Sequence, residues 1–320
     1  QTCALPISMN LKEDAMLEKV DLTKKISKEE YKAKMPQMEI ELGRLQRECR
    51  ELKIPVMIVF EGFGASGKGV QIGKLIQSMD PRGFQVFPIK AETEDERMHP
   101  FLWRFWTKTP EAGRIAIFDG SWYRKVLIDR FEKRTREKEI ETAFHSIEAF
   151  EKQLTDGGTI LVKLLLDIDQ KEQKKRFEKL LEKKETAWRV SQGDRERNAK
   201  YSEYAAMMEE VLYRSDTKSA PWTVIEATDR RFATVKIYMT VIHALAEAVE
   251  AVQRRRMEEQ AIKAAEQVSG QQEAAEIMRQ AGRELERLQS SVLSRADLTL
   301  AYGKEEYEKR LKKLQKKIEK

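Results

Sequence analysis

The chain has 320 residues, 36% of them charged, and 60 basic against 54 acidic residues give a net charge of +6, which suits a polyanionic ligand or an ordinary charged surface. This length can bury a sizeable core in one large or two small domains, and the two cysteines, Cys3 and Cys49, exclude a disulfide framework or a cysteine metal site. Because no apolar run approaches the ~18 residues of a membrane span and no secretory signal is visible, we expect a cytoplasmic protein without a membrane partner.

The first 53 residues are predicted to form an N-terminal segment and a helix. Residues 1–8 do not begin with Met and match nothing later in the chain, so we interpret them as a fragment boundary or a sequence scar, with Met9 as a possible start. The remainder is rich in Lys, Glu and Leu, which favour a helix leading directly into the first strand.

A phosphate-binding loop is the most informative motif of the chain. The apolar run Val56–Phe60 is followed by a glycine-rich turn with G-x-x-x-x-G-K spacing and then by a helical pattern at Lys68–Ser78. Glycines let backbone N–H groups surround phosphate oxygens, the helix N-terminus adds partial positive charge, and the lysine reaches the outer phosphates. A structural glycine turn is the alternative interpretation. The residues expected to bind phosphate are Gly62, Gly64, Ala65, Ser66, Gly67, Lys68 and Gly69, the last standing where the motif usually has a Mg²⁺-binding Ser or Thr.

Strand and helix patterns alternate over residues 54–252, which we predict to be one domain. The expected strands are Val56–Phe60, Gln85–Ile89, Arg114–Phe118, Thr159–Leu166 and Thr223–Glu226. The expected helices are Lys68–Ser78, Glu94–Trp106, Trp122–Lys133, Glu139–Leu154, Lys171–Lys183, Glu196–Tyr213 and Arg230–Val252. Nearly continuous apolar strands are typical of sheets that are covered on both faces. The pattern therefore predicts an α/β fold with a parallel sheet of about five strands flanked by helices.

The third strand ends in a carboxylate, Asp119, 51 residues after Lys68. Beside a phosphate-binding loop, an acid at this place can hold Mg²⁺ directly or through water. The alternative interpretation is a simple helix cap. The next six residues, 120–125, contain two aromatic and two basic side chains at an expected helix start.

The C-terminal part is predicted to leave the domain. Residues 253–291 are polar and helix-forming, which indicates a helical linker, either one long helix or a hairpin; a coiled-coil surface is the alternative. Within 292–320, the words at 297–299 and 304–307 repeat those at 21–23 and 28–31 with an offset of 276 residues. We interpret 292–320 as the start of a truncated second repeat, with chance similarity of charged helices as the alternative.

Four separated motifs together resemble the second polyphosphate kinase family. They are Glu61-Gly62-x-x-Ala65-x-Gly67-Lys68-Gly69, Leu102-Trp103-Arg104-Phe105-Trp106, Asp119-x-Ser121-Trp122-Tyr123 and Ala220-Pro221-Trp222. The resemblance implies a phosphate-loop kinase-like three-layer fold with a helical lid. It also implies Mg²⁺-dependent transfer between inorganic polyphosphate and AMP or ADP, without a nucleic-acid partner. The repeat resembles the tandem arrangement of polyphosphate:AMP phosphotransferases, and self-association into a homo-oligomer is expected as a possibility.

The resemblance also implies roles for individual residues. Lys68, Asp119 and Arg124 would be catalytic, with Asp119 holding Mg²⁺, and the lid would span about 182–204. Further contacts to nucleotide or phosphate would come from Arg104, Lys125, Arg189, Arg195 and Arg197, with Trp188 and Asp194 also in the lid. The cations just before the lid, Arg176 among them, are interpreted as a solvated helix face.

Two departures from the family pattern weaken the expectation of turnover. Gly64 stands where active members carry an acid, and Gly120 stands where they carry an arginine. We expect Gly64→Asp, alone or with Gly120→Arg, to raise activity if these gaps make the unit slow. A non-catalytic, polyphosphate-binding or structural unit of a tandem enzyme is the alternative function, and a generic phosphate-loop ATPase is a further one.

Overall fold

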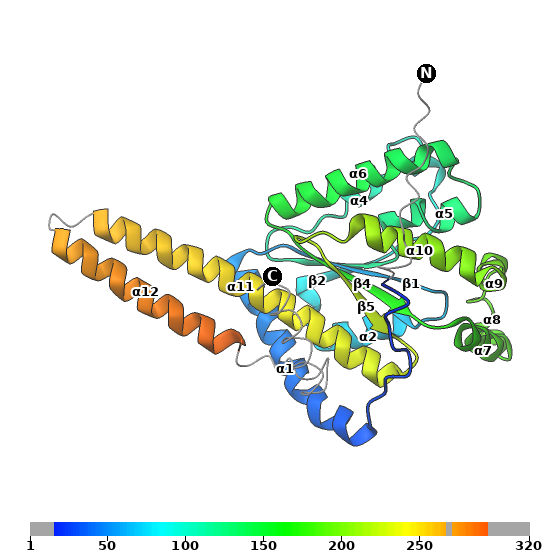
Figure 1. Ribbon diagram of the computed structural model, residues 1–320, viewed down its shortest axis with the longest axis horizontal. Helices are drawn as coiled ribbons and strands as arrows, with labels where there is room; N and C mark the ends of the chain where they lie inside the picture. Colours follow the sequence, from blue (N-terminus) through cyan, green and yellow to red (C-terminus); the bar gives the residue numbers. More distant parts are fainter. Residues whose placement is uncertain (1–15, 267–270, 294–320) are drawn as a thin grey trace, which may run out of the picture.

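The computed structural model describes residues 16–266 and 271–293, and its centre is a five-stranded sheet (Figure 1). The strands are β1 Val56–Gly62, β2 Phe84–Pro88, β3 Ile115–Asp119, β4 Ile160–Asp167 and β5 Trp222–Glu226. All pairings are parallel, in the order β2-β3-β1-β4-β5. The predicted strands and their parallel arrangement are confirmed.

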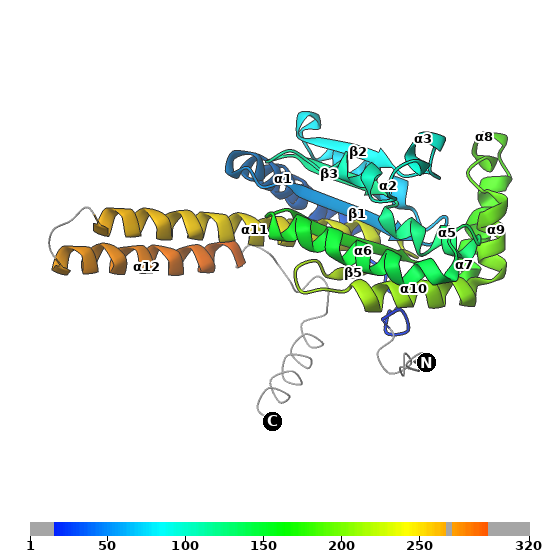
Figure 2. The same cartoon turned by 90° about the horizontal axis from the view of Figure 1, so that it is seen from above.

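Helices cover both faces of the sheet, which confirms the predicted three layers (Figures 1 and 2). One face carries α1 Lys28–Leu52, α2 Lys68–Gln77 and α11 Arg230–Glu266. The other carries α4 Trp103–Trp106, α5 Ile128–Phe131, α6 Glu137–Asp156 and α10 Tyr201–Ser215. At the carboxyl ends of the strands lie α3 Glu94–Arg97, α7 Gln170–Leu181, α8 Lys184–Ala187 and α9 Gln192–Ala199; the 3₁₀ turns are η1 Pro81–Gly83 and η2 Trp122–Lys125.

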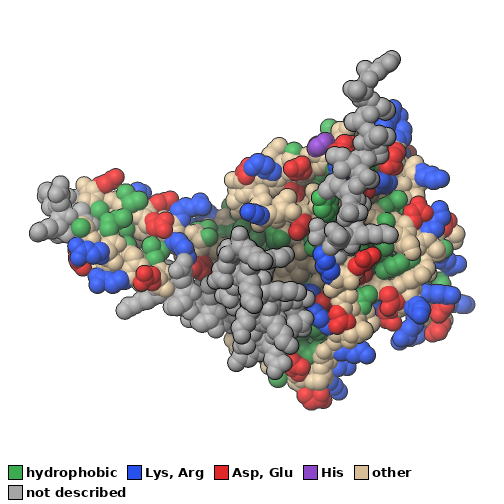
Figure 3. All heavy atoms as spheres, viewed as in Figure 1, with side chains coloured by type: hydrophobic (Ala, Val, Ile, Leu, Met, Phe, Trp, Pro, Cys, Tyr) green, Lys and Arg blue, Asp and Glu red, His purple; other side chains and the backbone are tan. Residues whose placement is uncertain are grey.

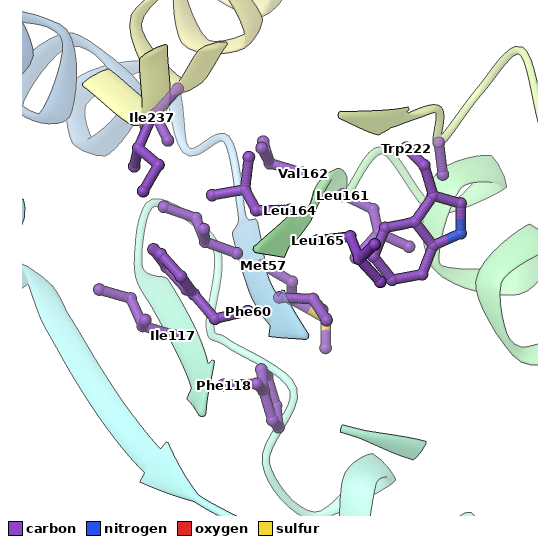
Figure 4. Close-up of a cluster of buried hydrophobic side chains, with 14 of the residues drawn as sticks. Met57, Phe60, Ile117, Phe118, Leu161, Val162, Leu164, Leu165, Trp222 and Ile237 are labelled. Atoms are coloured by element: carbon purple, nitrogen blue, oxygen red, sulfur yellow. The ribbon is translucent and has the colours of Figure 1, made fainter. Parts of the chain in front are cut away.

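The central strands are buried on both faces because two layers of helices cover them. In β1 every residue is buried, and Met57 and Phe60 are 0% exposed. Figure 4 shows these side chains among Phe118 from β3, Leu164 from β4 and Ile237 from α11. Burial of such side chains stabilises the fold by about 1.5–3 kcal/mol each. The core therefore holds the carboxyl ends of β1, β3 and β4 in fixed register.

A buried ion pair interrupts this apolar core. The Nζ atom of Lys163 in β4 is 2.8 Å from Oε2 of Glu151 in α6, and the lysine is 0% exposed. The same carboxylate accepts hydrogen bonds from the indole of Trp122 and the hydroxyl of Tyr123, at 2.9 and 2.5 Å. The aromatic residues that follow β3 therefore anchor η2 in the core, and the charged chain within β4 has partners for its burial.

Three predicted helices are each divided in two. Within Glu94–Trp106, helix α3 ends at Arg97 and α4 begins at Trp103; Pro100, which lies between them, has no N–H to continue a hydrogen-bond ladder. Trp122–Lys133 is a 3₁₀ turn followed by α5, because its aromatic side chains are held by α6. Glu196–Tyr213 changes direction at Lys200 (φ −106°, ψ 42°), which separates α9 from α10.

A helical hairpin extends from the domain. Helix α11 continues beyond Val252 to Glu266, and α12, Gln271–Leu293, packs beside it (Figures 1 and 2). Among the described residues only α11 is long and apolar enough to cross a membrane, but 61% of its apolar window is buried in the protein, so it is a core helix. The expectations for residues 1–8 and most of the proposed second repeat, 294–320, fall outside the described residues.

Candidate functional site

The glycine-rich loop between β1 and α2 has the backbone conformation of a tight turn. Gly62 has φ +136°, and a side chain there would lie 2.8 Å from the backbone N of Leu166 in the neighbouring strand β4. Gly67, the N-cap of α2, has φ +107°, and Ala65 has φ +58°, which an L-residue rarely adopts. These angles fold the five residues between the strand and the helix into a compact, concave turn.

Side-chain donors hold the carbonyl groups of the loop. The ammonium nitrogen of Lys68 lies 2.9 Å from the carbonyl oxygen of Gly62 and 3.4 Å from that of Phe63. The amide nitrogen Nε2 of Gln173, from α7, donates to the carbonyl of Gly64 at 3.1 Å. The lysine thus spans the loop at its base, where its ammonium group is bonded to carbonyl oxygens.

Arg176 of α7 holds the remaining loop carbonyls. Its Nη1 donates to the carbonyl oxygens of Ala65 and Ser66 at 3.1 and 3.0 Å. Its Nη2 donates to those of Ala227 and Thr228, after β5, at 2.8 and 3.0 Å. The residue is only 7% exposed, so the interpretation of Arg176 as part of a solvated face is wrong. Sequence spacing could not show that this one cation of a charged helix faces inward.

The backbone N–H groups of the loop are left without acceptors. Within the described part of the chain, no hydrogen bond is formed by the N–H groups of Gly64, Ala65, Gly67, Lys68 and Gly69. The loop carbonyls are hydrogen-bonded to side chains, and the loop N–H groups have no acceptor. At the N-terminus of a helix, such a set of N–H groups forms a nest that can bind an anion. The arrangement can therefore accept phosphate oxygens from several backbone donors together.

Two carboxylates lie beside this nest. Asp119, at the end of β3, has its Oδ2 atom 3.9 Å from the position that a Cβ on Gly69 would take. Glu61, the residue before Gly62, is buried and accepts a 2.7 Å hydrogen bond from the hydroxyl of Ser121. Burial raises the pKa of Glu61, and the charge of Lys68 opposes that rise. Sequence analysis assigned no role to Glu61, although an acid closing an apolar strand was a usable signal.

The donor set is compatible with Mg²⁺, which commonly takes one or two carboxylates together with substrate phosphates and water. Asp119 stands beside the first turn of α2, next to the nest, and supplies one carboxylate there. Position 69 contributes no hydroxyl because it is glycine. Among the described residues no group of three or more His, Cys, Asp or Glu could hold a metal by itself, so the protein alone offers an incomplete shell.

The other cations expected at the site have partners or lie on the surface. Three form ion pairs, namely Arg104 with Glu96 at 3.2 Å, Arg124 with Asp129 at 3.3 Å, and Arg197 with both Asp194 and Glu132 at 2.7 Å. Lys125 lies 5.8 Å from the ring centre of Phe101, Arg189 lies 5.4 Å from that of Trp188, and Arg195 is exposed. Arg189 and Arg195 are thus open to solvent, whereas Arg104 and Arg197 are nearly buried and paired with carboxylates.

The proposed lid rests directly on the loop. The side chain of Phe63 stacks on Tyr201 with ring centres 4.8 Å apart. A Cβ at Gly64 would lie 3.1 Å from both Oδ1 of Asp194 and Cζ of Phe177. Burial opposes ionisation of Asp194, but hydrogen bonds from Ser191 and Arg197 lower the pKa of its carboxyl. The lid therefore places a carboxylate beside the loop position where the sequence lacks one.

Charges of both signs alternate over the visible face, including the end formed by α7 to α9 (Figure 3). On this face, the end formed by α7 to α9 therefore has no extended surface of one charge. The feature that suits an anion is local, namely the nest and Lys68.

Comparison with known proteins gives a consistent result. A family model described as Polyphosphate kinase 2 (PPK2) matches residues 25–256. The chain is 36% identical to the polyphosphate:AMP phosphotransferase of Pseudomonas syringae pv. tomato over 243 residues, which are 76% of this chain and 49% of that protein. A solved structure described as a polyphosphate kinase 2 from Pseudomonas aeruginosa superposes with a TM-score of 0.70 at 35% identity, over 73% of this chain and 50% of that one. Polyphosphate kinase 2 from Arthrobacter aurescens gives 0.68 at 30% identity, over 72% and 85%. The chain spans about half the length of the Pseudomonas relatives it matches.

Proposed function

The chain belongs to the polyphosphate kinase 2 family, and from this membership we propose that it transfers phosphoryl groups between inorganic polyphosphate and a nucleotide, AMP or ADP. The observation that carries the proposal is the loop, whose carbonyls are held while its N–H groups are free. AMP is the first acceptor to test because the Pseudomonas syringae relative is a polyphosphate:AMP phosphotransferase.

Each group at the loop has a distinct task in the proposed reaction. The free N–H groups bind and orient the phosphates, and Lys68 offsets the negative charge that builds on the transferred phosphoryl. Asp119 would hold Mg²⁺, and the ion would supply positive charge against the phosphates. The carbonyls of Gly62 and Phe63 keep the ammonium group at the base of the loop.

The lid residues would complete the site around polyphosphate. Arg189 and Arg195 are solvent-facing and free to meet a chain of phosphates, and Arg124 and Lys125 approach from the segment after Asp119. Closure of these groups would exclude water, which otherwise competes with the nucleotide for the phosphoryl group. Arg104 and Arg197 belong to the same proposed set after exchange of their carboxylate partners.

A second candidate is a polyphosphate-binding unit with little turnover, acting beside a second domain in a tandem or oligomeric protein. Gly64 and Gly120 favour it, because the loop and the end of β3 lack two charged groups of the family pattern. Cytoplasmic location is proposed for either function, since the buried thiol of Cys49 is unpaired and a reducing compartment suits it.

The deciding experiment incubates the purified chain with polyphosphate, Mg²⁺ and either AMP or ADP and measures new ADP or ATP by chromatography. Product that disappears on chelation of Mg²⁺ is the expected result. Saturable polyphosphate binding without product supports the second candidate. Hydrolysis of ATP that is indifferent to polyphosphate contradicts both and indicates a generic ATPase.

A further inference from the structure

Among the residues that the structure describes, Arg176 is the one side chain whose hydrogen bonds join the phosphate-binding loop to the segment after β5. Its Nε donates to Oε1 of Glu172, one turn earlier on α7, at 2.7 Å. Together with the bonds from Nη1 to the loop carbonyls and from Nη2 to the 227–228 carbonyls, all five of its N–H donors are used. We propose that Arg176 is a positioning residue that keeps the loop in its anion-binding conformation; the inference rests on the phosphate-binding role proposed above.

The reason lies in the direction of the peptide groups. The peptide unit that turns the Ser66 carbonyl toward Arg176 turns the N–H of Gly67, which has no acceptor, toward the opposite side, where the phosphates would lie. If the Ser66 carbonyl rotated inward, partially negative oxygen would replace that donor in the nest and repel the anion. The bond to the Ala65 carbonyl holds the adjoining peptide unit, whose N–H, that of Ser66, donates to the carbonyl of Phe63 at 3.2 Å. The guanidinium therefore favours the conformation with donors inward, without contacting the phosphates.

The loop needs this support because part of it is strained. Ala65 has φ +58°, a backbone angle that L-residues rarely adopt because it brings Cβ close to the backbone. The two carbonyls that follow this angle are the two that accept from Nη1 of Arg176. Hydrogen bonds from a buried, charged donor are among the stronger ones in proteins, so they offset the strain.

Lysine cannot reproduce this role. An ammonium group has three donors on a single atom, whereas the planar guanidinium directs donors to two loops at once. Glu172 fixes the plane of the guanidinium by its bond to Nε. The role therefore requires the guanidinium of an arginine, and a positive charge alone is not sufficient.

The test compares Arg176→Ala, Arg176→Lys and the control Lys175→Ala with the unmodified chain. Lys175 neighbours Arg176 on α7, but its side chain is 78% exposed and it approaches Glu172 only at 3.5 Å. Hydrogen exchange of the loop peptide, measured without ligand, reports loop order independently of turnover. Calorimetry with ADP and with polyphosphate reports affinity, and both are repeated with millimolar guanidinium.

We expect Arg176→Ala and Arg176→Lys to exchange at least tenfold faster in the peptides covering 62–69 and 226–230, while α6 is unchanged. Affinity should fall at least tenfold, and guanidinium, unlike methylammonium, should restore part of it in Arg176→Ala. If that variant does not fold, Arg176→Lys alone decides the matter. Loop exchange and affinity in Arg176→Lys equal to those of Lys175→Ala would overturn the proposal. An unmodified chain that binds neither ligand contradicts the phosphate site instead, while faster loop exchange in the variants would still support the positioning role.

Discussion

At the scale of single residues, Lys68 offers the most direct test of the site. Within residues 62–69, Lys68 is the only charged residue, and its ammonium group contacts the carbonyl oxygens of Gly62 and Phe63. Lys68→Ala should lower transfer at least tenfold, because a positioned charge at the transferred group is lost. Initial rates of ADP or ATP formation measure this. Lys179→Ala, an exposed lysine of α7, serves as the control, and an unchanged rate in Lys68→Ala would remove Lys68 from the site.

The structure changes what we expect of the substitutions Gly64→Asp and Gly120→Arg, which would restore the two charged residues of the family pattern. Gly120 has φ +76°, so an arginine there would be strained. An aspartate at Gly64 would meet the carboxylate of Asp194 and the ring of Phe177. The lid must therefore move before an aspartate at position 64 can help, whereas an arginine at position 120 would stay strained by its own backbone angle.

A double-mutant cycle between positions 64 and 194 follows from this contact. Gly64→Asp alone should not raise transfer, because two carboxylates would face each other beside the loop. Asp194→Asn should raise transfer severalfold in the Gly64→Asp background and not in the unmodified chain. Rates for the four proteins measure the coupling. A gain from Gly64→Asp alone, or additive effects of the two changes, would contradict this contact.

Asp167 makes stability depend on pH. It is 3% exposed at the end of β4, and burial, aided by the neighbouring charge of Glu226, raises the pKa of its carboxyl from 3.8 to about 7. Because the folded state holds this proton more tightly than the unfolded state, the contribution of Asp167 to stability falls as pH rises from about 4 to about 7. Above pH 7 the penalty is complete.

Asp167→Asn should remove that penalty. Relative to the unmodified chain, we expect little change in unfolding free energy near pH 4 and a gain of about 2–4 kcal/mol near pH 8. Urea unfolding at several pH values measures the difference. Asp156→Asn, an exposed site paired with Lys152, provides the control. A difference that is constant with pH would show that Asp167 keeps an ordinary pKa.

At the scale of elements, the buried pair of Lys163 and Glu151 fixes α6 on the sheet. Desolvation lowers the pKa of Lys163, and the charge of Glu151 opposes that change. Lys163→Met should destabilise the fold by about 3–5 kcal/mol, because it leaves the buried carboxylate of Glu151 without its opposite charge. Adding Glu151→Gln should recover part of this loss. Urea unfolding of the single and double variants tests the coupling, and purely additive losses would rule it out.

Strands were predicted more accurately than short helices. Each strand is an apolar run buried on both faces, so composition alone marks it, as in Val56–Gly62. The turns around Pro100, Trp122 and Lys200 depend on contacts with other elements, and their sequences also fit longer helices. Local periodicity therefore placed the sheet but not the segments that border the site.

At the scale of the molecule, the hairpin is separable from the site. Helix α12 packs against α11 beyond the sheet, whereas the loop, Asp119 and Arg176 lie at the carboxyl ends of the strands (Figure 2). A chain ending after Glu266 should lose less than about 1 kcal/mol of stability, or about 2–4 °C in Tm, and keep its ligand affinity. Thermal unfolding and calorimetry check this, and a collapse of either would make the hairpin part of the folded unit.

The sequence by itself determined the parallel α/β fold, the glycine-rich turn after β1 and the family, because glycine spacing, apolar runs and separated motifs are properties of the chain. Only the tertiary structure decided which side chains serve that loop. It turned Arg176 inward, buried Glu61 beside Lys68 and brought Asp194 to Gly64. The contacts of Arg176 with Ala65 and of Asp194 with Gly64 join residues more than a hundred positions apart. No local pattern encodes such contacts, since burial and partner choice arise only when helices pack on the sheet.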